Sequence, residues 1–176
     1  IHVFADGSML WGSYGGTGYR DAQGNCYDIR EIKNAYCMLP LNTDELLIGT
    51  EGGFFKTFNK NTRKVASFPY ILSKEAQKKS LYSLPSYVLY LYDTPTHYLV
   101  GSTKGLWKLD KKTRILSPID IWVDQVLLPT LEVKHIQPGP LRGQWLLSTQ
   151  LGLICIDEHG QGATWYPKQG STGVYK

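Results

Sequence analysis

Apolar residues in this chain occur in short stretches that are separated by glycine, proline, asparagine and aspartate. The longest uninterrupted stretch covers residues 87–92, far below the roughly 20 apolar residues that a membrane-spanning helix needs. A typical stretch ends at a small residue, a glycine-containing turn follows, and another stretch begins, as in residues 105–109. Short apolar runs bounded by turn residues predict β-strands.

Four segments of the chain share one pattern of hydrophobic and small residues. Each reads leucine, an apolar residue, a small residue, serine or threonine, two variable residues and glycine. These segments are residues 10–16, 47–53, 99–105 and 146–152. Their mean spacing is about 45 residues, which is typical of four-stranded propeller blades and of some helical repeats. The short-strand pattern excludes the helical repeats.

Three further strand patterns accompany each segment. The strand after it ends at aspartate or asparagine, with glycine or threonine three residues later, which suits a type I turn. These turns begin at Asp21, Asn59, Asp110 and Asp157. A final strand follows at residues 26–29, 64–68, 114–116 and 163–166, and an earlier strand precedes each segment at residues 2–5, 35–41, 87–92 and 133–137.

Four strands per copy predict an all-β fold, a β-propeller segment of about four four-stranded blades. We place the blades at residues 1–30, 34–70, 86–119 and 132–167. The strands at residues 46–48, 98–100 and 145–147 are apolar on both faces, so the blades are expected to stack face to face around an axis. The second copy has one extra residue between Gly53 and Asn59, which we interpret as a β-bulge.

Residues 47–54 and 99–110 resemble the two-component regulator propeller repeat. That repeat reads approximately Trp-Ile-Gly-Thr-x-x-Gly-Leu-x-x-Leu-Asp and continues into a threonine-containing turn. The resemblance extends over nearly the whole chain. It departs from the family where leucine replaces tryptophan in all four copies, and where Ser148 replaces glycine in the fourth.

The resemblance implies a function that composition does not indicate. Such propellers commonly form the extracytoplasmic, periplasmic sensor region of bacterial hybrid two-component systems, many of which control carbohydrate-utilisation genes. By this resemblance the chain is a piece of a larger propeller. Its expected partners are an oligosaccharide ligand, the remaining blades, downstream sensor modules and a histidine kinase.

Charge and cysteine content exclude several other classes of protein. The net charge is only +4, and lysine and arginine are spread along the chain, apart from Lys74, Lys78 and Lys79. Nucleic-acid binding and direct membrane insertion are therefore not expected. Three cysteines without a CxxC motif, and four histidines without metal-ligand spacing, indicate neither a disulfide scaffold nor a metal site. We expect no cofactor.

Catalytic signatures are absent from the sequence, which lacks HExxH, P-loop, GxSxG and SxxK motifs. We therefore predict a non-catalytic sensor. Two alternatives stay open. One is a protein-interaction propeller, in which the same surface binds a partner chain or a second protomer. The other is a propeller glycan hydrolase or lyase, whose carboxylates would converge from different blades.

The geometry of a four-stranded meander predicts where a ligand would bind. The connection between the second and third strands and the connection to the next blade share one face of the sheet. Positions that vary between matching copies can carry recognition without loss of the fold. The candidate ligand-binding residues on this face are Tyr14, Arg30, Lys33, Glu51, Lys104, Trp122 and Gln150.

Two expectations concern the surface of the isolated chain. The longest connection, residues 71–86 with Lys78 and Lys79, is predicted to be a solvated loop. Four blades are expected to form an open arc, which exposes the apolar faces of the terminal blades. We therefore expect concentration-dependent homodimers or poor solubility of the isolated segment.

Overall fold

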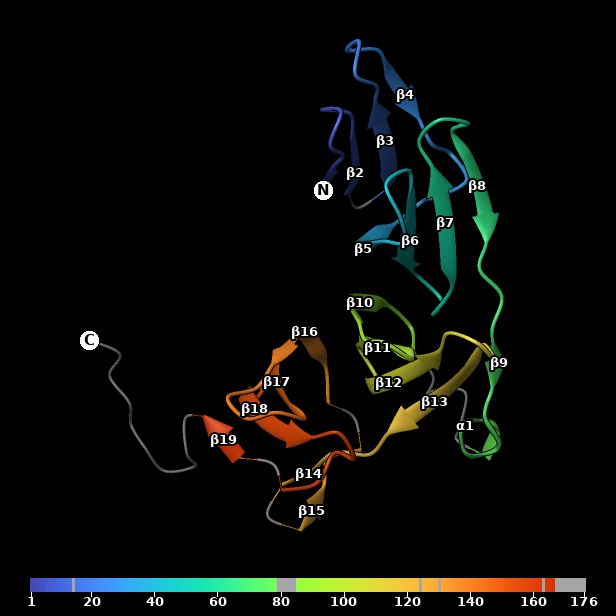
Figure 1. Cartoon of the computed structure of the whole chain (residues 1–176). Coiled ribbons are helices and arrows are strands. Elements are labelled where there is room, and N and C mark those ends of the chain that lie inside the picture. The colour runs from blue at the N-terminus through green and yellow to red at the C-terminus, as the bar shows by residue number, and fades with distance from the viewer. Residues whose placement is uncertain (14, 79–84, 124, 130, 163, 167–176) are drawn as a thin grey trace, which may run out of the picture.

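Antiparallel meanders of four strands follow one another along the chain and stand side by side in an arc (Figure 1). The computed structural model describes residues 1–13, 15–78, 85–123, 125–129, 131–162 and 164–166. Within these residues nearly all regular structure is β-strand, which confirms the predicted all-β class. No helix in the described ranges is long and apolar enough to cross a membrane.

Each meander corresponds to one copy of the repeat, and the four meanders are called blades 1 to 4. Blade 1 contains β1 (His2–Val3), β2 (Met9–Ser13), β3 (Gly16–Arg20) and β4 (Cys26–Asp28). Blade 2 contains β5 (Ala35–Pro40), β6 (Glu45–Thr50), β7 (Phe55–Asn59) and β8 (Lys64–Ser67). Blade 3 contains β10 (Val88–Asp93), β11 (His97–Ser102), β12 (Gly105–Asp110) and β13 (Ile115–Ile119). Blade 4 contains β16 (Val133–Pro138), β17 (Gln144–Thr149), β18 (Gly152–Asp157) and β19 (Thr164–Tyr166).

The turns between third and fourth strands are held by the side chain that begins them. The oxygen Oδ1 of Asn59 accepts a hydrogen bond from the backbone N–H of Thr62 at 3.0 Å. Asp110 accepts from Thr113 at 2.7 Å, and Asp157 accepts from Gln161 at 2.7 Å. Side chains that cap their own turn are what aspartate and asparagine at this position predict.

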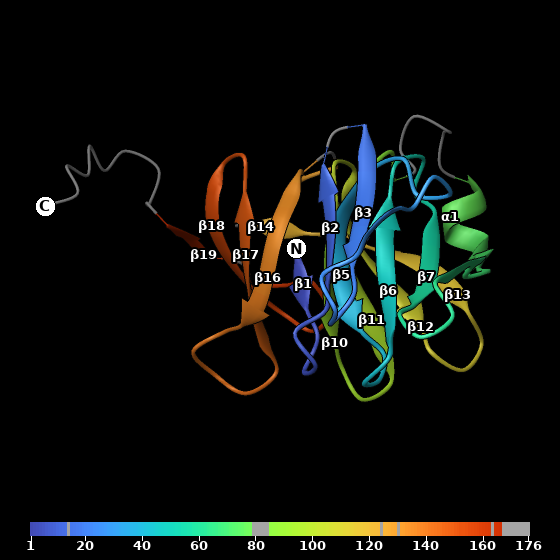
Figure 2. The same ribbon diagram turned by 90° about the horizontal axis from the view of Figure 1, so that it is seen from above.

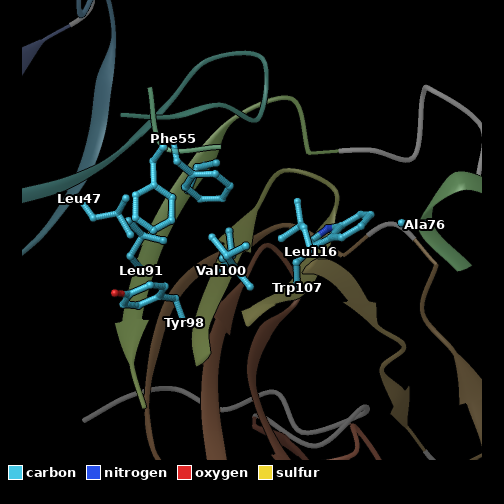
Figure 3. Close-up of a cluster of buried hydrophobic side chains, with 11 residues drawn as sticks. Leu47, Phe55, Ala76, Leu91, Tyr98, Val100, Trp107 and Leu116 are labelled. Atoms are coloured by element: carbon cyan, nitrogen blue, oxygen red, sulfur yellow. The ribbon is translucent and has the colours of Figure 1, made fainter. Parts of the chain in front are cut away.

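Apolar cores lie between neighbouring blades, and the second strands of blades 2 and 3, β6 and β11, are buried on both faces. The core between blades 2 and 3 is shown in Figure 3. The first repeat position faces the following blade, and the second faces the preceding one. Thus Leu47 belongs to the core between blades 2 and 3, whereas Ile48 belongs to the core between blades 1 and 2.

The third repeat position is where the next blade makes its closest approach. A Cβ atom on Gly12 would lie 2.5 Å from the Ala35 carbonyl oxygen, and one on Gly101 would lie 2.6 Å from that of Val133. A Cβ on Gly49 would lie 2.4 Å from a methyl group of Val88. All three neighbours begin the first strand of the next blade, namely β5, β10 and β16, and these first strands are called the inner strands. The glycines are therefore required by the distance between blades.

The inner strands also share a bulge close to these contacts. The register of β5 against β6 shifts between Ala35 and Cys37, which leaves Tyr36 as an additional residue. Equivalent shifts occur in β10 and β16. The bulge that was expected after Gly53 is wrong, because β6 and β7 pair regularly from Glu45 with Asn59 to Gly49 with Phe55. The extra residue of the second copy lengthens the turn at residues 51–54 instead.

The long connection between blades 2 and 3 is packed, so the prediction of a wholly solvated loop is wrong. Strand β9 (Ile71–Leu72) pairs in parallel with β13 and covers the edge of blade 3. Helix α1 (Lys74–Lys78) follows, its first turn capped by Ser73 Oγ, which accepts from the N–H of Ala76 at 3.2 Å. Ala76 is fully buried against the core between blades 2 and 3. Lys79 lies outside the described residues.

Charged side chains add further links between blades. Lys60 Nζ lies 2.5 Å from Asp6 Oδ2 of blade 1 and 3.5 Å from Asp44 Oδ1 of blade 2, and only 10% of its side chain is exposed. Arg63 and Arg114 immediately precede the fourth strands β8 and β13, and they have left-handed φ angles of 55° and 60°. The Arg63 guanidinium lies 4.1 Å from the ring centroid of Tyr27 in blade 1.

The arc is open between blade 1 and blade 4 (Figures 1 and 2). The outer face of each terminal blade carries one polar residue that the inner interfaces lack. Arg20, paired with Met9, occupies the place taken by buried Phe58 in blade 2. Ser148 occupies the place of the contact glycine in blade 4. Association of two chains through these faces stays a prediction.

The glycine contacts can be tested by adding a single methyl group. Gly101→Ala is expected to lower the free energy of unfolding by about 1–3 kcal/mol, because the new Cβ would collide with the backbone of Val133. Ser148→Ala, at the equivalent position of blade 4, serves as the control and should change stability far less. Urea denaturation measures both. Equal stability of the two variants would show that the glycine is dispensable.

The Lys60 contact predicts a dependence of stability on pH. The hydrogen bond from Lys60 holds the pKa of Asp6 well below its usual range, and the Ser8 hydroxyl adds to the effect. A carboxyl whose pKa is lowered by folding stabilises the protein above its unfolded pKa, and this stabilisation is lost as the pH falls. Asp6→Asn should therefore be less stable than the natural chain near neutral pH, and the difference should shrink below about pH 4. Denaturation curves across this range, with Asp28→Asn as control, would contradict the assignment if the difference did not change.

Candidate functional site

Segments from blades 1 and 2 meet on the face where the short turns lie. They are the connection at residues 29–34, which leads from β4 to β5, and the β6–β7 turn at residues 51–54. The β2–β3 turn of blade 1 lies beside them, because its Gly15 is hydrogen-bonded to the connection. These connections are the ones predicted to share a face, and the structure brings them into direct contact.

Asn34 joins the three segments through its side-chain amide. Its Oδ1 accepts a hydrogen bond from the backbone N–H of Gly15 at 2.8 Å. Its Nδ2 donates to Glu51 Oε2 at 2.6 Å. One amide therefore fixes the β2–β3 turn of blade 1 to the β6–β7 turn of blade 2. A bond to a carboxylate is stronger than one between neutral groups, so Glu51 is held in place.

The β6–β7 turn differs from the other short turns because it contains the extra residue. Gly52 and Gly53 both adopt left-handed φ angles, 76° and 72°, which other residues rarely adopt. The N–H of Gly52 donates to the carbonyl of Ser86, and Glu51 forms an isolated β-bridge with Tyr87. The turn therefore contacts the residues that immediately precede β10 of blade 3. Phe54, at the end of the turn, is 60% exposed.

A pocket of about 520 Å³ lies between the connection and this turn. Its lining contains three cations, two carboxylates, an amide, a hydroxyl and an aromatic ring. The lining residues are Arg30, Glu31, Ile32, Lys33, Asn34, Thr50, Glu51, Gly52, Phe54 and Lys56. Charged groups and hydrogen-bonding groups beside an exposed ring can hold a ligand that has hydroxyl groups on its edges and C–H groups on its faces.

The cations of the pocket differ in how they are engaged. Arg30 Nε lies 3.1 Å from Asp28 Oδ2, but its side chain is 88% exposed, so the pair is weakly held. Within the described residues neither Lys33 nor Lys56 makes an ion pair. Their ammonium groups therefore remain available to a ligand with hydroxyl or carboxylate oxygens.

The predicted ligand-binding residues separate into groups. Arg30, Lys33 and Glu51 line the pocket together. Lys104 lies in the turn of blade 3, where its N–H donates to Ser102 Oγ at 3.0 Å and its carbonyl accepts from Trp107 Nε1 at 3.0 Å. Lys104 is not among the pocket residues.

The other candidates lie in or near blade 4, apart from one in blade 1. Gln150 Oε1 accepts from the backbone N–H of Glu132 at 2.5 Å, a contact within blade 4 and the connection to it. Trp122 begins the hairpin of β14 (Trp122–Val123) and β15 (Val126–Leu127), and its N–H donates to the carbonyl of Gly160 at 3.0 Å. It is therefore tied to the β18–β19 turn. Tyr14 lies outside the described residues.

Seven of the ten lining residues, Asn34, Phe54 and Lys56 among them, were not among the candidates predicted from the sequence. One signal could have pointed to Phe54. The extra residue of the second copy lengthens the turn that ends at Phe54, and it marks the place where this blade departs from the others. Nothing in the sequence indicates that the Asn34 amide joins two turns, because its partners are 19 and 17 residues away.

The Cys37 thiol lies outside the pocket and is engaged in packing. Burial raises the pKa of the Cys37 thiol to about 12, and its Sγ donates to the carbonyl of Val88 at 3.4 Å. A thiol that stays protonated near neutral pH is a poor nucleophile. Across the described part of the chain no cluster of three or more histidine, cysteine, aspartate or glutamate residues could hold a metal ion.

Comparison with known proteins gives similarity of fold. No protein-family model matches the chain, and no curated protein matches it in sequence. The surface component PorZ of the type-IX secretion system of Porphyromonas gingivalis aligns with a TM-score of 0.62 at 12% identity, over 93% of this chain and 26% of that one. The extracellular domain of the putative hybrid two-component system BT3049 from B. thetaiotaomicron aligns with a TM-score of 0.56 at 17% identity, over 89% of this chain and 20% of that one.

A third structure with the same kind of fold is an enzyme. Dihydro-heme d1 dehydrogenase NirN aligns with a TM-score of 0.57 at 15% identity, over 93% of this chain and 35% of that one. The chain thus spans between 20% and 35% of the length of these three proteins. Identities this low show a shared fold, and a fold alone does not determine function.

The role of Asn34 can be tested by removing its amide. Asn34→Ala is expected to increase the rate of hydrogen exchange at the Gly15 amide, because its acceptor is lost. Global stability should fall by no more than about 1 kcal/mol, since the contact is exposed. Exchange followed by NMR tests both parts. Asn61→Ala, in the β7–β8 turn, is the control and should leave the Gly15 amide unchanged.

Proposed function

We propose that this chain is the ligand-binding part of an extracytoplasmic propeller sensor, located in the periplasm as part of a hybrid two-component system. In this proposal the propeller binds an oligosaccharide without turnover and relays binding to a histidine kinase. The repeat resemblance and the fold shared with the BT3049 extracellular domain support the sensor class. The observation that carries the ligand site is the pocket between blades 1 and 2.

The composition of the pocket favours a sugar over an apolar ligand. Its walls present ammonium, guanidinium, carboxylate, amide and hydroxyl groups, and its main exposed apolar group is the Phe54 ring. Hydrogen bonds to ring hydroxyls would orient a sugar, and stacking on Phe54 would supply apolar contact. Three cations against two carboxylates also suit a ligand that carries an acidic group.

We propose binding without catalysis because Glu51, one of the two carboxylates of the pocket, already has a structural task. Glu51 accepts the short hydrogen bond from Asn34, and its backbone pairs with Tyr87. A general acid or nucleophile has to be presented to the substrate. A carboxylate that fixes two turns is better suited to hold ligand hydroxyls in a constant orientation.

A protein-interaction propeller is the second candidate function. It is favoured by the exposed side chains on the outer face of blade 4, where Leu153 is 42% exposed, and by Trp11 on the outer face of blade 1. In this alternative the outer faces, and not the pocket, would bind a partner chain or a second protomer. A glycan hydrolase or lyase would instead require turnover of a bound sugar.

Calorimetry with defined oligosaccharides tests the proposal. The full chain is titrated with neutral glucose oligomers and with galacturonic acid oligomers, each from monomer to hexamer. We expect binding by at least one series, a fall in affinity of about tenfold or more for Lys33→Ala and Phe54→Ala, and no released product.

Two control variants match these substitutions in exposure. Lys112→Ala removes an exposed cation from the β12–β13 turn, and Leu141→Ala removes an apolar side chain that is 66% exposed, close to the value for Phe54. Both should bind as the natural chain does. Binding that survives in Lys33→Ala and Phe54→Ala would place the ligand elsewhere, and product formation would favour the enzyme.

A further inference from the structure

The first strands of blades 2, 3 and 4, which line the concave side of the arc (Figure 1), each contain one bulged residue. In β5 the register shift isolates Tyr36, and in β10 and β16 the equivalent additional residues are Leu89 and Lys134. A bulged residue leaves the alternation between the two faces of a sheet. Its side chain is therefore not committed to the cores on either side of the blade.

The residue at the bulge varies among blades, although the backbone does not. Tyrosine, leucine and lysine occupy equivalent places, so the fold does not require an aromatic ring there. Tyr36 is nevertheless 37% exposed beside a second ring, that of Tyr87, with centroids 5.3 Å apart and planes at 82°. This edge-to-face contact fixes the orientation of both rings.

The tyrosine pair adjoins the pocket through Glu51. The backbone of Glu51 pairs with that of Tyr87, while its carboxylate accepts from Asn34, two residues before Tyr36. Glu51 and Asn34 line the pocket, and the same two residues connect it to the tyrosines. The pocket and the tyrosine pair are thus neighbouring parts of one surface.

From this arrangement we infer that Tyr36 and Tyr87 form a second subsite next to the pocket, a stacking platform in which the exposed Tyr36 ring contacts a pyranose ring and Tyr87 fixes the orientation of the Tyr36 ring. The inference rests on the proposed function and makes it more specific. One sugar unit occupies the pocket beside Phe54, Lys33 and Lys56, and a further unit lies on the Tyr36 ring. The ligand is therefore an oligosaccharide of several units, and a monosaccharide fills only part of the site.

The platform predicts that Tyr36 matters only for the longer ligands. Using the oligomer series that the full chain binds, affinity should rise from the monomer to the longer oligomers. Tyr36→Leu is the test variant, because leucine stands at the equivalent bulge in blade 3 and the fold accommodates it there. It should lower the affinity for longer oligomers by about tenfold and leave monomer binding unchanged.

Three comparisons separate a stacking role from a structural one. Tyr36→Phe keeps the ring and should bind as the natural chain does. Leu127→Ala, at a side chain that is also 37% exposed, is the control for loss of apolar surface. Lys33→Ala should weaken binding of every length, because it acts in the pocket. Circular dichroism and urea denaturation confirm that each variant is folded.

The possible failures are distinguishable. If Lys33→Ala weakens binding but Tyr36→Leu binds oligomers of all lengths like the natural chain, the platform is overturned and the proposed function stands. If Tyr36→Leu weakens monomer binding as strongly as oligomer binding, Tyr36 belongs to the pocket and the separate subsite is overturned. If no oligomer of either series binds the natural chain, both the proposed function and the platform fail.

Discussion

The approach of one blade to the next at a residue without a side chain sets the geometry of the whole arc. Gly12, Gly49 and Gly101 each lie against the first residue of the following inner strand, at distances that leave no space for a Cβ atom. That contact fixes how closely the sheets stack, so the leucines beside the glycines reach into the next core. Other links between blades, such as the Lys60 ion pairs, add to a spacing that the glycines allow.

The same constraint explains why the candidate site lies where it does. Near the glycine contacts, turns of one blade touch the connection to the next, and small changes in those turns alter the surface without disturbing the cores. Blade 2 has such a change, one extra residue in the β6–β7 turn. The longer turn reaches Ser86 and Tyr87 of the following connection and exposes Phe54 over the pocket. A repeat scaffold can in this way carry a site at the copy that departs from the others.

Most of the fold could be predicted from the sequence because the same local pattern of strands and turns occurs four times. Strand positions, the capped turns at Asp21 and its equivalents, and the stacking of blades follow from short-range patterns, and the structure confirms them. The packed connection was not predictable in the same way. Strand β9 is two residues long, and it is held by pairing with β13, about 44 residues away in sequence, and by the packing of Leu72 on the core. The lysine-containing sequence that follows it is typical of a solvated loop.

The candidate site was predictable only in part, for a similar reason. Arg30, Lys33 and Glu51 could be placed on one face from the topology of a meander, and they do line one pocket. Trp122 is on a connection that the same rule assigns to that face, yet its backbone is tied to Gly160 in a different turn. Contacts between distant side chains, such as Asn34 with Glu51, depend on the twist and spacing of blades, which strand patterns do not specify.

Hydrogen exchange with bound ligand tests most directly whether the pocket beside the lengthened β6–β7 turn of blade 2 is the recognition site. The full chain is compared with and without a saturating oligosaccharide from the series that it binds. The account predicts protection of amides at residues 30–36 and 50–56, with little change in the equivalent turns of blades 3 and 4. Protection centred on those other turns, or on the outer faces of blades 1 and 4, would contradict it.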